Sequence, residues 1–339
     1  MVHNTSGPGS DTVTNHGTTA DHGTTADHGT TADHGTTADH GSTADHGTTA
    51  DHGNATNHGA AADDDVGLFG PDSVSWRVHG EPILWIAAIR ALFLQMLLPR
   101  AITGVVRNSD FRADPWGRLY RTAEFFGVVI FGPTSAAEAA GRRVRRIHSM
   151  MRATDPDTGV EFRIDDPDLL RWIHVTAAES FCSVSQRAGL GLSPAEVDQY
   201  YQEQREVARL VGLDPATVPA TAADIEAYYR EMEPRLRVSA DAWQTARYLT
   251  FPRLPWGLGR TPVRPLWIGV IGYGVSLMPR WARRMYRLPG LPTTDLAASI
   301  TARGLRLALR TLPTSVYEGP LYHAAMERAA RQSASAGAT

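Results

Sequence analysis

The sequence contains no lysine, a single cysteine and, in its first 65 residues, no basic or aromatic side chain. The missing lysine excludes Schiff-base chemistry and a Walker-A phosphate loop. One cysteine, Cys182, excludes an intrachain disulfide and a zinc site made of cysteines, which fits a reducing compartment. Residues 1–65 also lack the basic start and apolar stretch of a secretory signal, so we expect a cytoplasmic protein.

Charge is distributed unevenly along the chain. Residues 1–65 hold ten of the 36 acidic residues, whereas all 33 arginines lie at or after Arg77. Residues 66–339 therefore carry 33 positive charges against 26 negative ones, a net of +7. This excess is modest and scattered, so we expect no nucleic-acid partner. We predict a tail over 1–65 and one large domain over 66–339, which is long enough for a single core.

The tail is a tandem repeat of the hexapeptide GTTADH, and it holds nine of the 13 histidines. A β-helix with this period needs an aliphatic residue in each repeat, and the largest apolar side chain here is alanine. The little apolar surface that alanine can bury cannot offset the conformational entropy lost when the chain is ordered. We therefore predict that the tail is disordered. The Asp-His pairs could bind transition metals weakly; the alternative is a solvated tail with no fixed site.

The body carries many helix-start signals, in which proline occupies the first turn or a serine and a glutamate form a capping box. These signals predict an all-α fold, a single large helical bundle, with a short hairpin at 159–164 after the turn at 155–157. The predicted helices are 81–98, 115–131, 135–152 (with Ser135 and Glu138 as capping box), 166–187, one starting at Ser193, 221–233, 239–249, 264–286, 294–310 and 318–331.

Two apolar runs, residues 83–98 and 265–279, raise the question of a membrane. Each is shorter than the about 20 residues that a transmembrane helix needs. We therefore expect both to be helices central to a large core. A peripheral contact with a membrane is the alternative, and it would suit an apolar substrate.

Two histidines outside the tail are candidate ligands. His148 and His174 lie in the middle of predicted helices, on apolar faces. The helix before them presents Arg118, Arg121 and Thr122 along one stripe, which we expect to be buried. Burying these polar groups is unfavourable unless an anionic or polar group pairs with them.

This pattern has three interpretations. A buried cofactor would use an arginine to bind a propionate or phosphate and an imidazole to ligate a metal, as in a protein that holds haem by a proximal histidine. In the second interpretation both histidines are hydrogen-bonded core residues, and the arginines pair with Asp110, Asp114 or Glu124. In the third, a non-haem metal binds both histidines together with Glu179 or Asp168.

Four blocks of the sequence, in this order, resemble the family of the bacterial rubber oxygenases (latex clearing proteins) and the fungal MpaB-type oxygenase. The blocks are Arg77-x-His79-Gly80-Glu81-Pro82, Asp110-Phe111-Arg112-Ala113-Asp114-Pro115-x-Gly117-Arg118-Leu119-x-Arg121-Thr122, Arg146-Ile147-His148 and Trp172-Ile173-His174-Val175-Thr176. The likeness runs from about Trp76 to the C-terminal helices. It implies a distantly globin-like, all-α fold with one haem b, which uses O₂ to cleave carbon–carbon double bonds of isoprenoid chains.

The resemblance also implies residue roles. The family's Arg-x-x-basic-Thr motif falls on Arg118, Arg121 and Thr122, and its axial iron ligand falls on His148. His174 matches a second family histidine near the haem, as a supporting residue or the rival ligand. Rubber oxygenases carry a lysine that can ligate iron where this chain has Arg121. Because a guanidinium has no lone pair to offer, Arg121 is expected to hydrogen-bond bound dioxygen or to pair with a propionate instead.

We therefore expect a haem b-dependent oxygenase that acts with O₂ on a hydrophobic, unsaturated, isoprenoid- or lipid-like small molecule. His148 would hold the iron, and Phe125, Phe126 and Met151 would line an apolar substrate channel. The haem would supply the oxygen chemistry. The protein would ligate the iron, orient the reactants and exclude water. The alternative is a non-catalytic helical protein that only binds haem or lipid.

Overall fold

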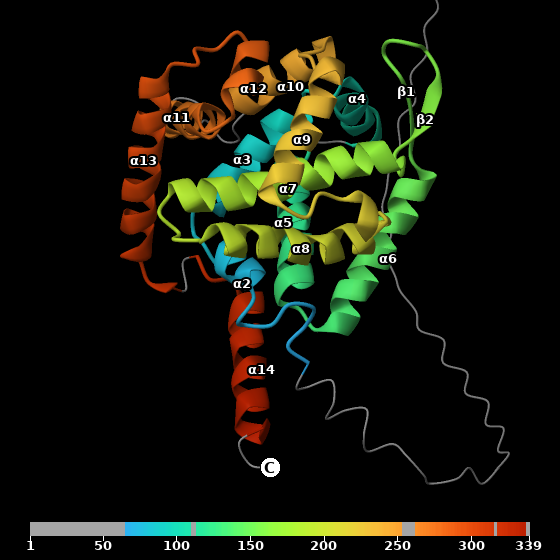
Figure 1. The fold of residues 1–339 in the computed structure, drawn as a ribbon. Coiled ribbons are helices and arrows are strands. Elements are labelled where there is room, and N and C mark those ends of the chain that lie inside the picture. The colour runs from blue at the N-terminus through green and yellow to red at the C-terminus, as the bar shows by residue number, and fades with distance from the viewer. Residues whose placement is uncertain (1–64, 110–112, 253–261, 315–316, 337–339) are drawn as a thin grey trace, which may run out of the picture. The chain divides into compact units, whose positions relative to one another are not determined.

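The computed structural model of the chain describes residues 65–109, 113–252, 262–314 and 317–336. Residues 1–64 of the tail predicted over 1–65 lie outside these ranges, whereas Asp65 lies within them. Within them the chain is almost entirely helical (Figure 1), so the all-α prediction is confirmed. The elements are α2 (Val74–His79), α3 (Leu84–Gln95), α4 (Pro99–Asn108), α5 (Pro115–Phe131), α6 (Thr134–Met150), β1 (Arg152–Thr154), β2 (Glu161–Arg163), α7 (Pro167–Arg187), α8 (Pro194–Val211), η1 (Pro215–Thr217), α9 (Ala222–Met232), η2 (Glu233–Arg235), α10 (Ala240–Thr250), α11 (Val263–Ser276), α12 (Arg280–Met285), α13 (Pro292–Arg310) and α14 (Pro320–Ala336).

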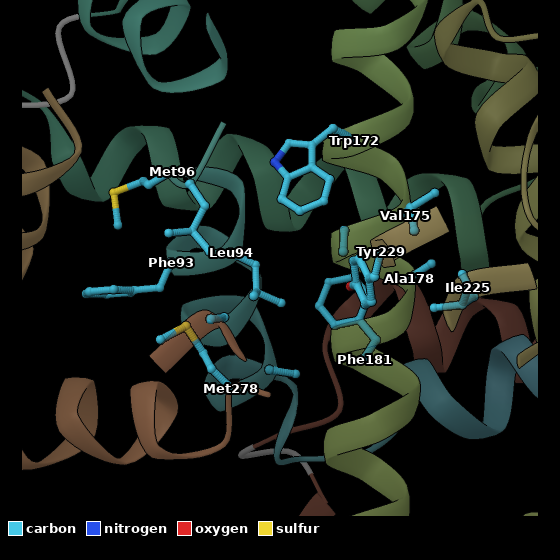
Figure 2. Close-up of a cluster of buried hydrophobic side chains, with 14 of the residues drawn as sticks. Phe93, Leu94, Met96, Trp172, Val175, Ala178, Phe181, Ile225, Tyr229 and Met278 are labelled. Carbon is cyan, nitrogen blue, oxygen red and sulfur yellow. The ribbon is translucent and has the colours of Figure 1, made fainter. Parts of the chain in front are cut away.

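Helix α7 is the centre of the bundle. It packs most extensively against α3, and it also contacts α2, α8 and α13. Figure 2 shows Trp172 and Phe181 of α7 beside Leu94 of α3 in the main cluster of buried apolar side chains. The antiparallel hairpin pairs Ala153 with Phe162, and β1 packs against α4.

The central run of apolar residues carries a buried ion pair. Arg90 of α3 is 2% exposed, and its guanidinium donates to both carboxylate oxygens of Glu179, one of them at 2.8 Å. Arg90 also donates to Ser180 Oγ, and Tyr229 donates to Glu179 at 3.0 Å. Because the charged groups of this pair all have hydrogen-bond partners, Arg90 can be buried in the predicted core helix.

Several helix starts lie where local signals predict them. Helix α7 begins with Pro167 at its first position, and the Asp166 side chain accepts from the Asp168 N–H. Helix α8 begins with the predicted capping box, in which Ser193 and Glu196 satisfy each other's backbone N–H. It ends at Val211 and is followed by Gly212, whose φ of 100° suits a residue without Cβ.

Three helix predictions need correction. The run over 83–98 begins as a helix only at Leu84 and breaks after Gln95, and α4 follows as a separate helix. The helix predicted over 264–286 is interrupted at Leu277–Pro279, because Pro279 has no backbone N–H to continue it. The short helix α2 was not predicted.

The capping box predicted at Ser135 and Glu138 does not form. Helix α6 already begins at Thr134, so Ser135 lies inside it, and Glu138 pairs with Arg209 instead. The cap comes from a distant part of the chain: Asp65 accepts from the Thr134 N–H at 2.7 Å and from the Thr134 hydroxyl at 2.9 Å. Asp65 also accepts from the Gly67 N–H at 2.8 Å.

Removing this carboxylate should destabilise the domain. Asp65→Ala leaves the first backbone donor of α6 without its partner, and losing such a cap costs about 1–2 kcal/mol. We expect that decrease in the free energy of unfolding, measured by urea denaturation. Asp72→Ala is the control, because Asp72 is exposed and makes none of these contacts. Equal effects of the two substitutions would contradict a capping role for Asp65.

The run over 265–279 is not central to the core, contrary to the prediction. Only Ile271, Gly274 and Val275 of α11 are buried, and Leu266 is among the most exposed apolar residues of the domain. Along the described residues no single helix has the length and apolarity of a membrane span. Helices α3 and α4 meet those criteria only as a pair, bent by 107° at the break between them.

Candidate functional site

Helices α5 and α6 bring Arg118 and His148 to the same level of the bundle. The two helices pack together and run in opposite directions, joined by Gly132 and Pro133 (Figure 1). Arg118 lies thirteen residues before the end of α5, and His148 lies fourteen residues after the start of α6. At 1.5 Å per residue each lies about 20 Å from the turn. The predicted cofactor-binding arginine and the predicted ligand therefore lie at a similar distance from the turn, one on each helix of the hairpin.

Aromatic contacts show which face of α7 is turned toward this hairpin. Phe181 of α7 packs edge-on against Phe126 of α5, with 5.2 Å between ring centroids, and against His79 of α2 at 5.1 Å. His174 lies seven residues before Phe181, which puts both side chains on one face of the helix. His174 therefore lies on the side of α7 that is turned toward α5.

His148 is half-buried, and its enclosed Nδ1 atom has no hydrogen-bond partner among the described residues. Burial lowers the pKa of His148, and the negative charge of Asp165 opposes that shift only in part. The imidazole is thus favoured in its neutral form, which has a lone pair to offer a metal. Because buried ring nitrogens are normally hydrogen-bonded, the unpartnered Nδ1 fits a residue whose partner is a bound group.

His174 is buried, and among the described residues none forms a hydrogen bond with its ring. Burial lowers its pKa to about 4, so this imidazole too is neutral near pH 7. The interpretation of His148 and His174 as hydrogen-bonded core residues therefore finds no support in the described residues.

Arg118 is a half-buried guanidinium with no carboxylate beside it in the described parts of the chain. It donates to the Ser109 hydroxyl, and the positive charge of Arg121 acts on it. Burial and the positive charge of Arg121 both lower the pKa of Arg118. An arginine in these surroundings is well suited to bind an anionic group in a bidentate manner.

The expectation of a fully buried polar stripe is wrong for Arg121 and Thr122. The Arg121 side chain is 62% exposed and lies 3.3 Å from Asp114, a pair that contributes little at such exposure. Thr122 is also exposed, and its hydroxyl donates to the Arg118 carbonyl at 3.0 Å. The reason is that burial along α5 is concentrated at its C-terminal end, at Val129 and Ile130.

The carboxylates suggested for a non-haem metal site are engaged elsewhere. Glu179 binds Arg90 and Tyr229 in the core, and Asp168 accepts from Arg171 at 3.1 Å. Across the described ranges no three His, Cys, Asp or Glu side chains gather where they could share a metal ion. The non-haem interpretation therefore lacks its ligand set in this part of the chain.

Two hollows lie along the β1–β2 hairpin, and neither is lined by Phe125, Phe126 or Met151, the residues of the expected channel. One of them, of about 540 Å³, is open and lined mostly by charged residues such as Arg100 and Asp165. Phe125 and Phe126 are half-buried, with 5.8 Å between their ring centroids. Their role as channel residues stays a prediction.

A family model decides the assignment of the chain. The model described as "ER-bound oxygenase mpaB/B'/Rubber oxygenase, catalytic domain" matches residues 76–312. The chain belongs to this mpaB/rubber oxygenase family. The match covers Arg118, Arg121, Thr122, His148 and His174, and it leaves out the repeat-containing tail and α14. No curated protein and no solved structure gives a significant match.

His79 is a buried residue of this oxygenase domain to which the sequence assigned no role. Its ring lies among Phe126, Phe181 and Tyr200, and its Nε2 is 3.4 Å from the Tyr200 hydroxyl. Burial lowers the pKa of His79 to about 3. The sequence signal was the apolar spacing of Val74, Val78 and His79, a stretch too short to predict a helix.

His79 should make the domain sensitive to acid. In the unfolded chain an ordinary histidine takes up its proton near pH 6.5, whereas the folded state resists protonation down to about pH 3. Between these values the unfolded state binds more protons, so stability falls as pH falls, by about 1.4 kcal/mol per pH unit for this one residue.

His79→Gln should remove that slope while retaining a partner for Tyr200. We expect the stability lost between pH 6 and pH 5 to be smaller by about 1 kcal/mol in the variant, measured by urea denaturation at each pH. An unchanged slope would show that His79 does not titrate as its burial requires.

Proposed function

We propose that the chain is a haem b-dependent oxygenase that uses O₂ to cleave a carbon–carbon double bond in a hydrophobic, isoprenoid- or lipid-like small molecule. Membership of an oxygenase family supports the reaction class. The observation that carries the cofactor is the enclosed Nδ1 of His148, which has no hydrogen-bond partner among the described residues. Arg118, on the neighbouring helix, has no carboxylate beside it in the same residues.

In this proposal His148 would ligate the haem iron, and Arg118 would bind a propionate. The neutral His148 imidazole provides the donor atom, and Arg118 provides charge-assisted hydrogen bonds. His174, also neutral and buried on the α7 face turned toward α5, is the rival ligand. The haem, when bound, supplies the oxygen chemistry, and the protein holds and orients the reactants.

Arg121 and Thr122 are proposed as polar groups of the catalytic pocket. A guanidinium has no lone pair to offer, so Arg121 acts only as a hydrogen-bond donor. Its exposed pair with Asp114 is weak, which leaves the guanidinium able to turn toward a bound anion. Phe125, Phe126 and Met151 would guide the apolar substrate and exclude water from the reacting atoms.

The test is O₂ uptake by haem-loaded protein with squalene as the unsaturated probe, followed by mass spectrometry of carbonyl products. We expect uptake and aldehyde or ketone products that are lost in His148→Ala. Haem bound without O₂ uptake on any unsaturated lipid would show a binding protein instead. Stoichiometric iron without porphyrin would show a non-haem enzyme.

A further inference from the structure

Helix α13 carries large apolar side chains on the face turned away from the bundle. Leu296, Ile300 and Leu307 are 64%, 60% and 70% exposed. At 3.6 residues per turn their directions lie within about 40° of one another, so they form one stripe. The opposite side of α13, at Ala298 and Ala302, is buried. An ordinary surface helix is apolar only toward the core, so the outward stripe needs an explanation.

The stripe belongs to a larger apolar region. Figure 1 shows α13 beside α11, and the two helices are in contact. A Cβ atom added at Gly269, Gly272 or Gly304 would meet no other atom within 4 Å, so the helix surface at these positions is uncovered. Of the exposed large apolar residues in the described chain, eight lie within 262–314: Val263, Leu266, Leu288, Leu291, Leu296, Ile300, Leu307 and Leu312.

The same segment is strongly basic. Residues 262–314 contain eight arginines and a single acidic residue, Asp295. Asp295 is shared by Arg280 and Arg283, and Arg306 pairs with Glu81. The remaining arginines are exposed, and the described residues provide no carboxylate within ion-pair distance of them: Arg264, Arg284, Arg287, Arg303 and Arg310. Arg303 and Arg310 lie within about 60° of the apolar stripe around the helix axis.

We propose that the α13 face, formed by Leu296, Ile300, Leu307, Arg303 and Arg310, docks on an anionic lipid bilayer. Aliphatic side chains that enter the boundary between headgroups and acyl chains, beside arginines that bind phosphates, are typical of interfacial helices. A second copy of the chain is disfavoured as the partner. A symmetric contact would bring the unpaired arginines of one copy against those of the other, and their like charges would repel. None of these residues belongs to the candidate site, so the inference is independent of the haem proposal.

The experiment is co-sedimentation of the full-length protein with large unilamellar vesicles. One set contains phosphatidylcholine with phosphatidylglycerol, and the other phosphatidylcholine alone. We expect binding to the anionic set only, weakened by added salt. Ile300→Gln/Leu307→Gln should lower the partition coefficient at least about tenfold. Arg303→Gln/Arg310→Gln should lower it by about tenfold or more.

Val160→Gln/Met326→Gln is the matched control. Val160 and Met326 are 64% and 43% exposed and lie outside the segment, so their replacement should leave binding unchanged. Because all the replaced side chains are exposed, the variants should fold, which circular dichroism checks. Absence of binding to anionic vesicles, or an equal loss in the control, would overturn the proposal. So would a dimer in light scattering that Ile300→Gln/Leu307→Gln converts to a monomer.

Discussion

His148→Ala should release the haem. The substitution removes the only side chain of the hairpin that combines a neutral imidazole with an enclosed, unpartnered ring nitrogen among the described residues. We expect the haem content of purified protein to fall at least about tenfold, which corresponds to about 1.4 kcal/mol or more of binding free energy. The measurement is the ratio of Soret to protein absorbance, with a pyridine haemochrome assay for content.

His174→Ala is the matched comparison. His174 is the other buried histidine of the region, and its replacement should leave most of the haem in place while shifting the Soret maximum. Loss of haem in His174→Ala with retention in His148→Ala would reverse the assignment of the ligand. Circular dichroism of both variants separates loss of the cofactor from loss of the fold.

Glu179→Ala should destabilise the domain more than any of the other single substitutions. It leaves the Arg90 guanidinium charged at 2% exposure with its counter-ion gone. Breaking a buried ion pair in this way costs about 3–5 kcal/mol. For a domain of this size we expect the melting temperature to fall by about 10 °C, measured by differential scanning calorimetry.

Two further variants make the Glu179 prediction specific. Arg90→Met/Glu179→Leu removes both charges and should recover most of the lost stability, because apolar residues of similar volume can replace a buried pair. Glu138→Ala breaks the partly exposed pair with Arg209 and should cost less than about 1 kcal/mol. A Glu179→Ala variant as stable as Glu138→Ala would contradict a structural role for the buried pair.

The fold was predictable where helix ends depend on neighbouring residues. Helix α5 begins after Asp114, which accepts from the Gly117 N–H, and α7 begins after Asp166 in the same way. Other ends depend on distant residues. The Leu277 carbonyl at the end of α11 accepts from Arg90 Nε and from Arg187, each at 3.0 Å. Such contacts are invisible to any local pattern, and a proline two residues further on was the only signal.

The candidate site was predictable in its residues but not in their surroundings. The helix-start signals placed Arg118 and His148 on consecutive predicted helices, and in the structure these are α5 and α6, which pack against each other. Periodicity could not show that Arg121 is exposed, because exposure depends on which helices cover α5. For the same reason the apolar run at 265–279 was assigned to the core, although α11 leaves much of its surface open.

The absorption spectrum of the purified full-length protein, produced with ample haem, tests the central claim most directly. The account predicts a Soret band with about one haem b per chain and its loss in His148→Ala. A spectrum without any Soret band, from protein that is folded by circular dichroism, would contradict it.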